Sequence, residues 1–85
     1  KMNDTEVRER LIAIKGVGPW TVEMFLIFAL GRADIFSPGD VGLQNAIRKQ
    51  YGKAPTPALI KRLSSRWAPY RSYACRYLWK SLDNE

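Results

Sequence analysis

The chain has 85 residues, of which 46% are hydrophobic, so it is long enough for one small domain with a packed core. Its 14 Lys and Arg against 8 Asp and Glu give a formal net charge of +6, which favours a polyanionic partner such as nucleic acid. One cysteine and no histidine exclude an internal disulfide framework, a four-cysteine metal site and histidine-based catalysis. No apolar run is long enough for a membrane span and no secretory signal is visible, so we expect an intracellular protein.

Helix start and stop signals recur along the chain and strand patterns do not, so we expect an all-α fold, a bundle of five helices. The first helix is predicted from the capping box of Asn3 and Glu6 to a stop at Gly16. Its apolar face is formed by Val7, Leu11 and Ile14.

The second helix is predicted from Pro19 to Leu30, where Gly31 stops it. Within it only Thr21 and Glu23 are polar, and a helix that is apolar on nearly all sides must be buried on most of them. The other short helices supply little cover, which predicts that the chain packs against more protein, either another chain or a missing part. The alternative is a compact bundle with this helix at its centre.

Three further helices are predicted: Val41 to Tyr51, stopped by Gly52; one beginning at Thr56-Pro57; and one beginning at Pro69. Their expected faces are Leu59, Leu63 and Trp67, then Tyr73, Tyr77 and Leu78. The tyrosines Tyr70, Tyr73 and Tyr77 are expected to pack, and the basic residues Arg66, Arg71, Arg76 and Lys80 to form a solvated helix surface.

The segment KGVG joins the first two helices in a tight turn. Free backbone amides at a helix start, together with the helix dipole, form a phosphate site. We expect Gly16 and Gly18 to supply positive φ and close approach of the phosphate, and Lys15 to add charge. Val17 is expected to belong to the same phosphate site, with its side chain beneath the turn. Thr21 is expected to cap the second helix or to contact phosphate. An ordinary helix–helix turn is the alternative.

The wider pattern LIAIKGVGPWT resembles the helix-hairpin-helix motif of DNA-binding proteins, which hold the DNA backbone without reading sequence. The resemblance implies that backbone carbonyls before the turn hold a sodium or potassium ion that bridges to phosphate. The matching positions are Ile12, Ile14 and Gly16. No other cofactor is expected.

Asp40 follows the turn by about twenty residues, and an Asp before a helix is a good N-cap. The hairpin, the spacing and this Asp together resemble the helix-hairpin-helix superfamily of base-excision DNA glycosylases, most closely the alkylated-base branch, DNA-3-methyladenine glycosylase II. The matching stretches are IKGVGPWTVEMFLIFALGRADIFSPGDVGLQ and WAPYRSYACRYLWKSL.

The resemblance covers Asp4 to about Leu82 but only the later part of such a two-lobed enzyme. It implies a hairpin motif at about 5–30, a catalytic-Asp loop at 32–40 and C-terminal helices at 41–82. The first residue, which is Lys and not Met, suggests a fragment. We therefore expect the missing N-terminal part to be a partner, and this chain alone to be weak or inactive.

The resemblance makes Asp40 the catalytic carboxylate, which stabilises positive charge on the sugar or assists a water. A helix N-terminus lowers the pKa of such a group and keeps it ionised. Trp20 stands where strand-cutting branches carry a nucleophilic Lys, which implies a monofunctional enzyme. Trp20 and Trp79 are placed on the walls of the base pocket, where indoles suit a cationic purine. Met24, where some members have Tyr, keeps an apolar wall. Plain core packing is the alternative for both tryptophans.

The predicted function is therefore hydrolysis of the N-glycosidic bond of alkylated purines of the 3-methyladenine type in double-stranded DNA, by base flipping, in base excision repair. Two alternatives remain open. One is a non-catalytic hairpin module that tethers a larger protein to DNA, and the other is a helical protein–protein interaction domain.

Overall fold

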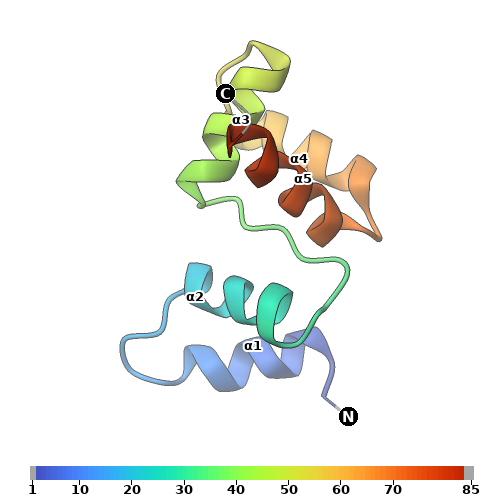
Figure 1. Cartoon of the computed structure of the whole chain (residues 1–85). Helices are drawn as coiled ribbons and strands as arrows, with labels where there is room; N and C mark the ends of the chain where they lie inside the picture. The colour runs from blue at the N-terminus through green and yellow to red at the C-terminus, as the bar shows by residue number, and fades with distance from the viewer. Residues whose placement is uncertain (1, 84–85) are drawn as a thin grey trace.

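The computed structural model describes residues 2–83, and this part of the chain is all-helical, as predicted. The elements are α1 (Asp4–Ile12), α2 (Pro19–Met24), η1 (Phe25–Ala29), α3 (Val41–Tyr51), α4 (Pro57–Trp67) and α5 (Arg71–Asp83). In Figure 1, α1 and α2 form a hairpin, here the hairpin unit (residues 2–31), and α3 to α5 form a three-helix unit (residues 41–83). A connecting loop (residues 32–40) joins them. Within residues 2–83, no helix has the length and apolar character needed to cross a membrane.

The predicted helix caps are confirmed. Asn3 Oδ1 accepts from the Glu6 N–H at 2.9 Å, and the Asn3 N–H donates to Glu6 Oε1 at 2.9 Å, which completes the capping box. Thr56 Oγ1 accepts from the backbone N–H of Leu59 at 3.2 Å at the start of α4. Gly52 ends α3 in the left-handed conformation with φ +66°. Local side-chain chemistry therefore sets these boundaries.

The prediction that the first helix reaches Gly16 is wrong, because α1 ends at Ile12. Two successive turns follow, in which the Ile14 N–H donates to Leu11 O at 3.0 Å and the Val17 N–H donates to Ile14 O at 3.1 Å. They reverse the chain, so Ile14 lies outside the helix with 54% of its surface exposed and takes no part in the core.

The second helix ends at Ala29, one residue before the predicted Leu30, with Gly31 just beyond it, and its last turn is widened. Leu30 N–H donates to the carbonyl of Phe25, five residues back, at 3.1 Å, which defines η1 as a π-helical turn. Arg32 N–H then bonds Leu26 O at 2.9 Å around Gly31, whose φ is +64°. The extra residue per turn alters which side chains of η1 face the core.

Two clusters of buried side chains stabilise the chain. The cluster of the hairpin unit and loop contains Val7, Val22, Leu26, Ile27 and Ile35. The cluster of the three-helix unit contains Leu43, Ala46, Ile47, Leu59, Ile60, Leu63, Cys75 and Leu78. Trp79 packs against both, so this side chain joins the two cores.

Only one face of the second helix is buried. Val22, Leu26 and Ile27 are almost fully covered, whereas Trp20 is 51% and Phe28 56% exposed. The alternative of a compact bundle with this helix at its centre is therefore wrong. The uncovered apolar side chains agree with the expectation that more protein packs here.

The expected packing of three tyrosines is also wrong. Tyr70 and Tyr73 are each 60% exposed and Tyr77 is 69% exposed. The face of α5 that contacts the core carries Ser72, Cys75 and Leu78, so Leu78 alone of the predicted face is buried. Helical spacing alone does not say which of two faces is turned inward.

Two basic residues of α5 are not merely solvated, in contrast to the prediction. Arg71 Nη1 lies 3.6 Å from Asp34 Oδ2. Arg76 Nη2 donates to Ile27 O at 3.3 Å. Both side chains therefore connect the three-helix unit to the preceding part of the chain.

Candidate functional site

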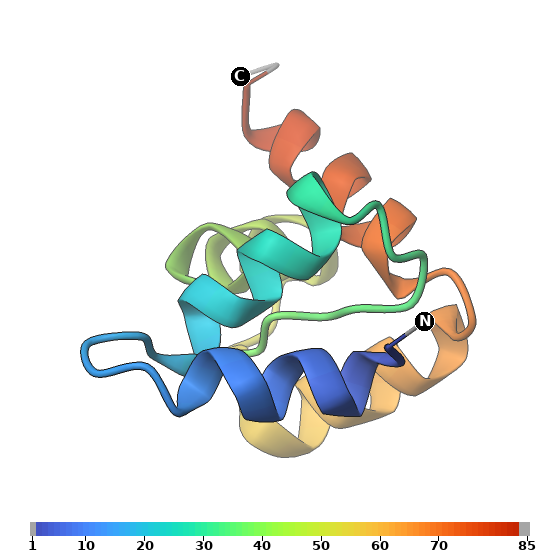
Figure 2. The same cartoon turned by 90° about the horizontal axis from the view of Figure 1, so that it is seen from below.

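The connecting loop is held by α5 before it reaches α3. Ser72 Oγ donates to Arg32 O at 2.6 Å and accepts from the Ile35 N–H at 2.9 Å. The backbone N–H of Arg71 donates to Asp34 Oδ1 at 3.2 Å. Figure 2 shows the loop running along the hairpin unit on its way to α3. These bonds fix the first part of the loop, residues 32–35, to α5, and the turn that ends at Asp40 follows it.

Asp40 is the N-cap of α3, as predicted from its position. Its Oδ2 accepts from the backbone N–H of Leu43 at 2.9 Å. Its own N–H donates to Ser37 O at 3.1 Å, which closes a turn through Pro38 and Gly39. The carboxylate is thus fixed at the positive end of the helix dipole.

Two indoles donate to this carboxylate, one from each unit. Trp20 Nε1 lies 2.6 Å from Asp40 Oδ1, and Trp79 Nε1 lies 2.9 Å from Asp40 Oδ2. The sequence predicted both tryptophans near the site but not these bonds. The available signal was that an indole N–H is donor-only and takes an acceptor when it is partly buried.

The pKa of Asp40 lies below its ordinary value of 3.8. Burial acts to raise it, but hydrogen bonds from Trp79, Trp20 and the backbone N–H groups of Leu43 and Gly42 outweigh that effect. The carboxylate is therefore ionised at neutral pH. A lowered pKa was predicted from the position of Asp40 at a helix N-terminus, and the two indole N–H groups lower it further.

The side chains near the Asp40 carboxylate are buried to different degrees. Trp79 stacks on Phe28 with ring centroids 5.6 Å apart, and the Arg76 guanidinium lies 4.9 Å from the Phe28 centroid. Trp20 is half exposed, so the plain-core alternative fails for it, whereas Trp79 is half-buried and packs in both cores. Met24 is half-buried against the hairpin core.

Gly42 is a site residue that the sequence analysis missed. A Cβ at this position would lie 3.1 Å from Asp40 Oδ2 and 3.4 Å from Trp79 Cδ1. A side chain here would therefore force the carboxylate or the indole to move by a few tenths of an ångström. The signal in the sequence was a glycine in the first turn of a helix, where alanine is intrinsically better.

The hairpin turn matches its prediction at one glycine of the two. Gly16 has φ +88°, but Gly18 is extended with φ −101° because it is the N-cap of α2. Thr21 is therefore not the cap. Val17 packs against the hairpin core as predicted, and its N–H is used within the turn. Lys15 is exposed at the turn.

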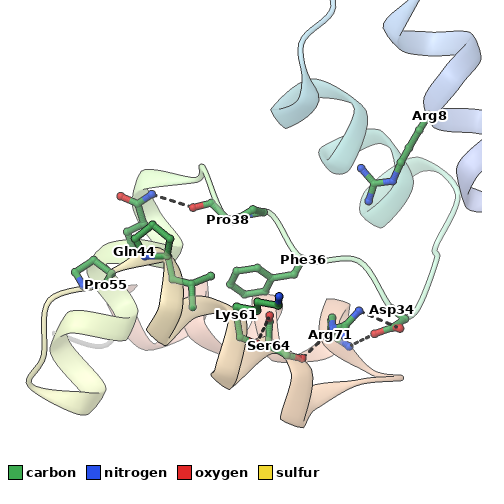
Figure 3. A pocket seen from close by; sticks show the side chains of 11 residues that line it. Arg8, Asp34, Phe36, Pro38, Gln44, Pro55, Lys61, Ser64 and Arg71 are labelled. Atoms are coloured by element: carbon green, nitrogen blue, oxygen red, sulfur yellow. Dashed lines mark hydrogen bonds and ion pairs between the residues drawn. The ribbon is translucent and has the colours of Figure 1, made fainter.

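A cavity of about 540 Å³ lies elsewhere, between α1, the connecting loop and α4 (Figure 3). Phe36, Pro38 and Ile60 form apolar parts of its lining, and Arg71 points to Asp34 at one end. Neither Asp40 nor the two tryptophans line it. This cavity is therefore distinct from the predicted base pocket.

Sequence comparison finds DNA-3-methyladenine glycosylases, although no protein-family model matches the chain. A Bacillus subtilis protein named as a candidate DNA-3-methyladenine glycosylase is 44% identical over 84 residues, which are 96% of this chain and 29% of the relative. DNA-3-methyladenine glycosylase 1 of Schizosaccharomyces pombe is 41% identical over 83 residues, 95% of this chain and 36% of the relative. The chain thus spans about a third of the length of these two curated relatives.

Solved structures give the same result. The DNA-3-methyladenine glycosidase of Bacillus halodurans superposes with a TM-score of 0.86 at 46% identity, over 95% of this chain and 38% of that one. The 3-methyladenine DNA glycosylase of Schizosaccharomyces pombe, solved with abasic DNA, gives 0.86 at 42% identity, over 93% and 39%. By sequence and by fold, the chain is a homologue of one segment of the DNA-3-methyladenine glycosylases.

Proposed function

We propose that this chain carries the catalytic carboxylate of a monofunctional DNA glycosylase that releases alkylated purines from double-stranded DNA inside the cell. The observation that supports this most directly is the environment of Asp40. An ionised carboxylate held by a helix terminus and two indole N–H groups is prepared to stabilise a developing positive charge. A simple DNA tether has no use for such an arrangement.

The proposed mechanism begins with phosphate capture by the backbone amides at Gly16 and Gly18, at the start of α2. The damaged nucleotide then leaves the stack, which costs less when its pairing is weak. Its base lies against the indoles, with Met24 as an apolar wall, and Asp40 faces the sugar. An alkylated purine is already cationic, so it departs as a neutral base without a strong general acid, in keeping with a chain that lacks histidine. A water then bonds to the sugar carbon that the base has left and gives up its proton to Asp40 or to solvent.

We propose that the product is an abasic site in an intact strand. Strand cleavage by this superfamily uses a Lys amine that forms a Schiff base, and Trp20 at that position has no amine. The Schizosaccharomyces pombe relative was solved with abasic DNA, which is this product.

We also propose that the backbone carbonyls of Ile12, Ile14 and Gly16 would hold a sodium or potassium ion beside the phosphate contact. The Ile14 carbonyl accepts from Val17 N–H at 3.1 Å, and its second lone pair can still face a cation. The ion would add positive charge at the phosphate contact, and no chemical step depends on it.

The proposed partner in catalysis is the N-terminal part found in the relatives. This chain spans 29% and 36% of two of them, and the half-exposed side chains of Trp20, Phe25 and Phe28 offer an apolar face to such a part. The chain by itself should bind DNA weakly and release little or no base.

The test is base release from methylated duplex DNA by the chain completed with that N-terminal part. Asp40→Asn keeps the shape of the side chain and should lower the rate by about 10²–10³-fold, the usual loss for one electrostatic contact in a transition state. DNA binding should stay within about twofold, and strands should stay intact until alkali is added. Strand cuts without alkali would contradict the monofunctional mechanism. Binding without base release by the wild type would favour the tether.

A further inference from the structure

Glu23 is a buried carboxylate that the proposed mechanism does not use. Only 8% of its surface is exposed. It lies on α2 three residues after Trp20, so the two side chains leave neighbouring positions on one side of the helix. Its Oε1 accepts from the hydroxyl of Ser37 at 2.6 Å, and Arg8 Nη1 lies 3.7 Å from its Oε2.

Ser37 is fully buried and begins the turn that ends at Asp40. Its carbonyl accepts from the Asp40 N–H at 3.1 Å, so the two residues are connected through the closed turn as well as through the chain. Helix α2 therefore holds this short turn at both ends: Glu23 binds its first residue, and Trp20 binds its last.

We propose that Glu23 and Ser37 are positioning residues, which set the separation between α2 and Asp40 and so hold the carboxylate under the Trp20 indole. The hydrogen bond from the Ser37 hydroxyl to Glu23 Oε1 is short, at 2.6 Å, which suits it to fix a distance. Neither residue touches the substrate. The inference rests on the proposed function, since its consequence for rate needs Asp40 to be the catalytic group.

Ser37→Ala is the direct test, in the full-length protein that contains this segment and the N-terminal part. A misplacement of about 1 Å can cost on the order of 100-fold in rate, so a partial loss of position should lower kcat about tenfold. KM for methylated DNA should change less than about twofold. The indole N–H resonance of Trp20 in an NMR spectrum should shift, because its acceptor has moved.

Ser72→Ala is the matched control. Ser72 is also a buried serine whose hydroxyl holds the connecting loop, but it bonds Arg32 and Ile35 and not the turn before Asp40. It should lower the melting temperature at least as much as Ser37→Ala while it leaves kcat and the Trp20 resonance nearly unchanged. Glu23→Gln, which keeps an acceptor oxygen for Ser37, should retain more activity than Glu23→Leu.

The proposal is overturned if Ser37→Ala leaves the Trp20 resonance in place, or if both serine variants lose kcat in proportion to melting temperature. Either result would make the Glu23–Ser37 bond an ordinary buried contact. If the wild type releases no base, the proposed function fails instead. The Trp20 resonance, measured without any substrate, still decides whether Glu23 and Ser37 position Asp40.

Discussion

The two units of the chain carry their charge very differently. Residues 41–83 contain nine Lys and Arg and one Asp, whereas residues 1–40 contain five basic and six acidic residues. The turn proposed to hold phosphate lies within residues 1–40, the nearly neutral part of the chain. Close contact with DNA would therefore come from backbone amides at a helix start, and long-range attraction from the three-helix unit.

The units also hold Asp40 differently. The Trp79 bond from the three-helix unit is partly buried, and the Trp20 bond from the hairpin unit is exposed. A hydrogen bond to a charged group gains strength as water is excluded. The three-helix unit should thus lower the pKa of Asp40 more than the hairpin unit does, although the hairpin unit supplies the shorter hydrogen bond.

Replacing each tryptophan in turn by phenylalanine tests whether the Trp79 bond matters more than the Trp20 bond. Of the variants in this comparison, these should change the rate of base release the most. Trp79→Phe keeps an aromatic ring and removes one N–H donor, and a bond to a charged group contributes about 1.5–3 kcal/mol. The rate of base release should fall about 10- to 100-fold. Trp20→Phe should cost less, as measured by single-turnover kinetics. An equal or larger loss for Trp20→Phe would reverse the comparison.

The acid side of the pH profile gives a second measure of the same pair. The pKa of Asp40 lies below its ordinary value of 3.8. The ionised carboxylate therefore contributes fully to the free energy of unfolding above that pH, and this contribution is lost as the pH falls through the lowered pKa. Activity should decline over the same range, because the ionised form is needed. In Trp79→Phe the decline should begin at a higher pH. Coincident profiles for wild type and variant would show that the indole does not tune the carboxylate.

The hairpin turn offers a pair of glycine variants with an intermediate effect. Gly16→Ala places a side chain at φ +88°, which should cost about 1–2 kcal/mol in the free energy of unfolding. Gly18→Ala has φ −101° and no atom within 4 Å of its Cβ, so the fold should be unaffected. If the turn approaches phosphate closely, Gly18→Ala should still weaken DNA binding in a fluorescence anisotropy titration. Unchanged binding would place the phosphate elsewhere.

Neutralising one charge in each unit should give the smallest effect and test the division of electrostatic roles. Lys15→Gln, at the turn, should reduce the slope of log K against log salt by about 0.9, as expected for one lost phosphate contact. Arg62→Gln, on α4, should slow association at low salt and leave that slope nearly unchanged. If Arg62→Gln changed the slope as much as Lys15→Gln, the three-helix unit would contact DNA directly.

The parts of the fold that could be predicted depend on residues close in sequence. The capping box of Asn3 and Glu6, the Thr56 cap and the Gly52 stop were all predicted, since each places donor and acceptor within four residues. The early end of α1 was missed because the first turn of the reversal, Leu11 to Ile14, contains no glycine or proline to mark it.

The parts of the site that were missed depend on distant residues. The bonds from Trp20 and Trp79 to Asp40 span 20 and 39 positions, and nothing local distinguishes an indole that donates to a carboxylate from one that only packs. The same holds for Glu23 and Ser37, which are 14 positions apart. The capping role of Asp40 was predictable because it needs only the next three residues.

Cys75 is completely buried in the three-helix core, and burial raises the pKa of its thiol to about 12. Thiolates, and not thiols, react with electrophiles, so this side chain is almost inert at neutral pH. An enzyme that repairs alkylation damage has to work while alkylating agents are present. Because its one cysteine is buried, the chain offers those agents no reactive thiol. The fold thus protects the protein from the same alkylation whose products in DNA it is proposed to remove.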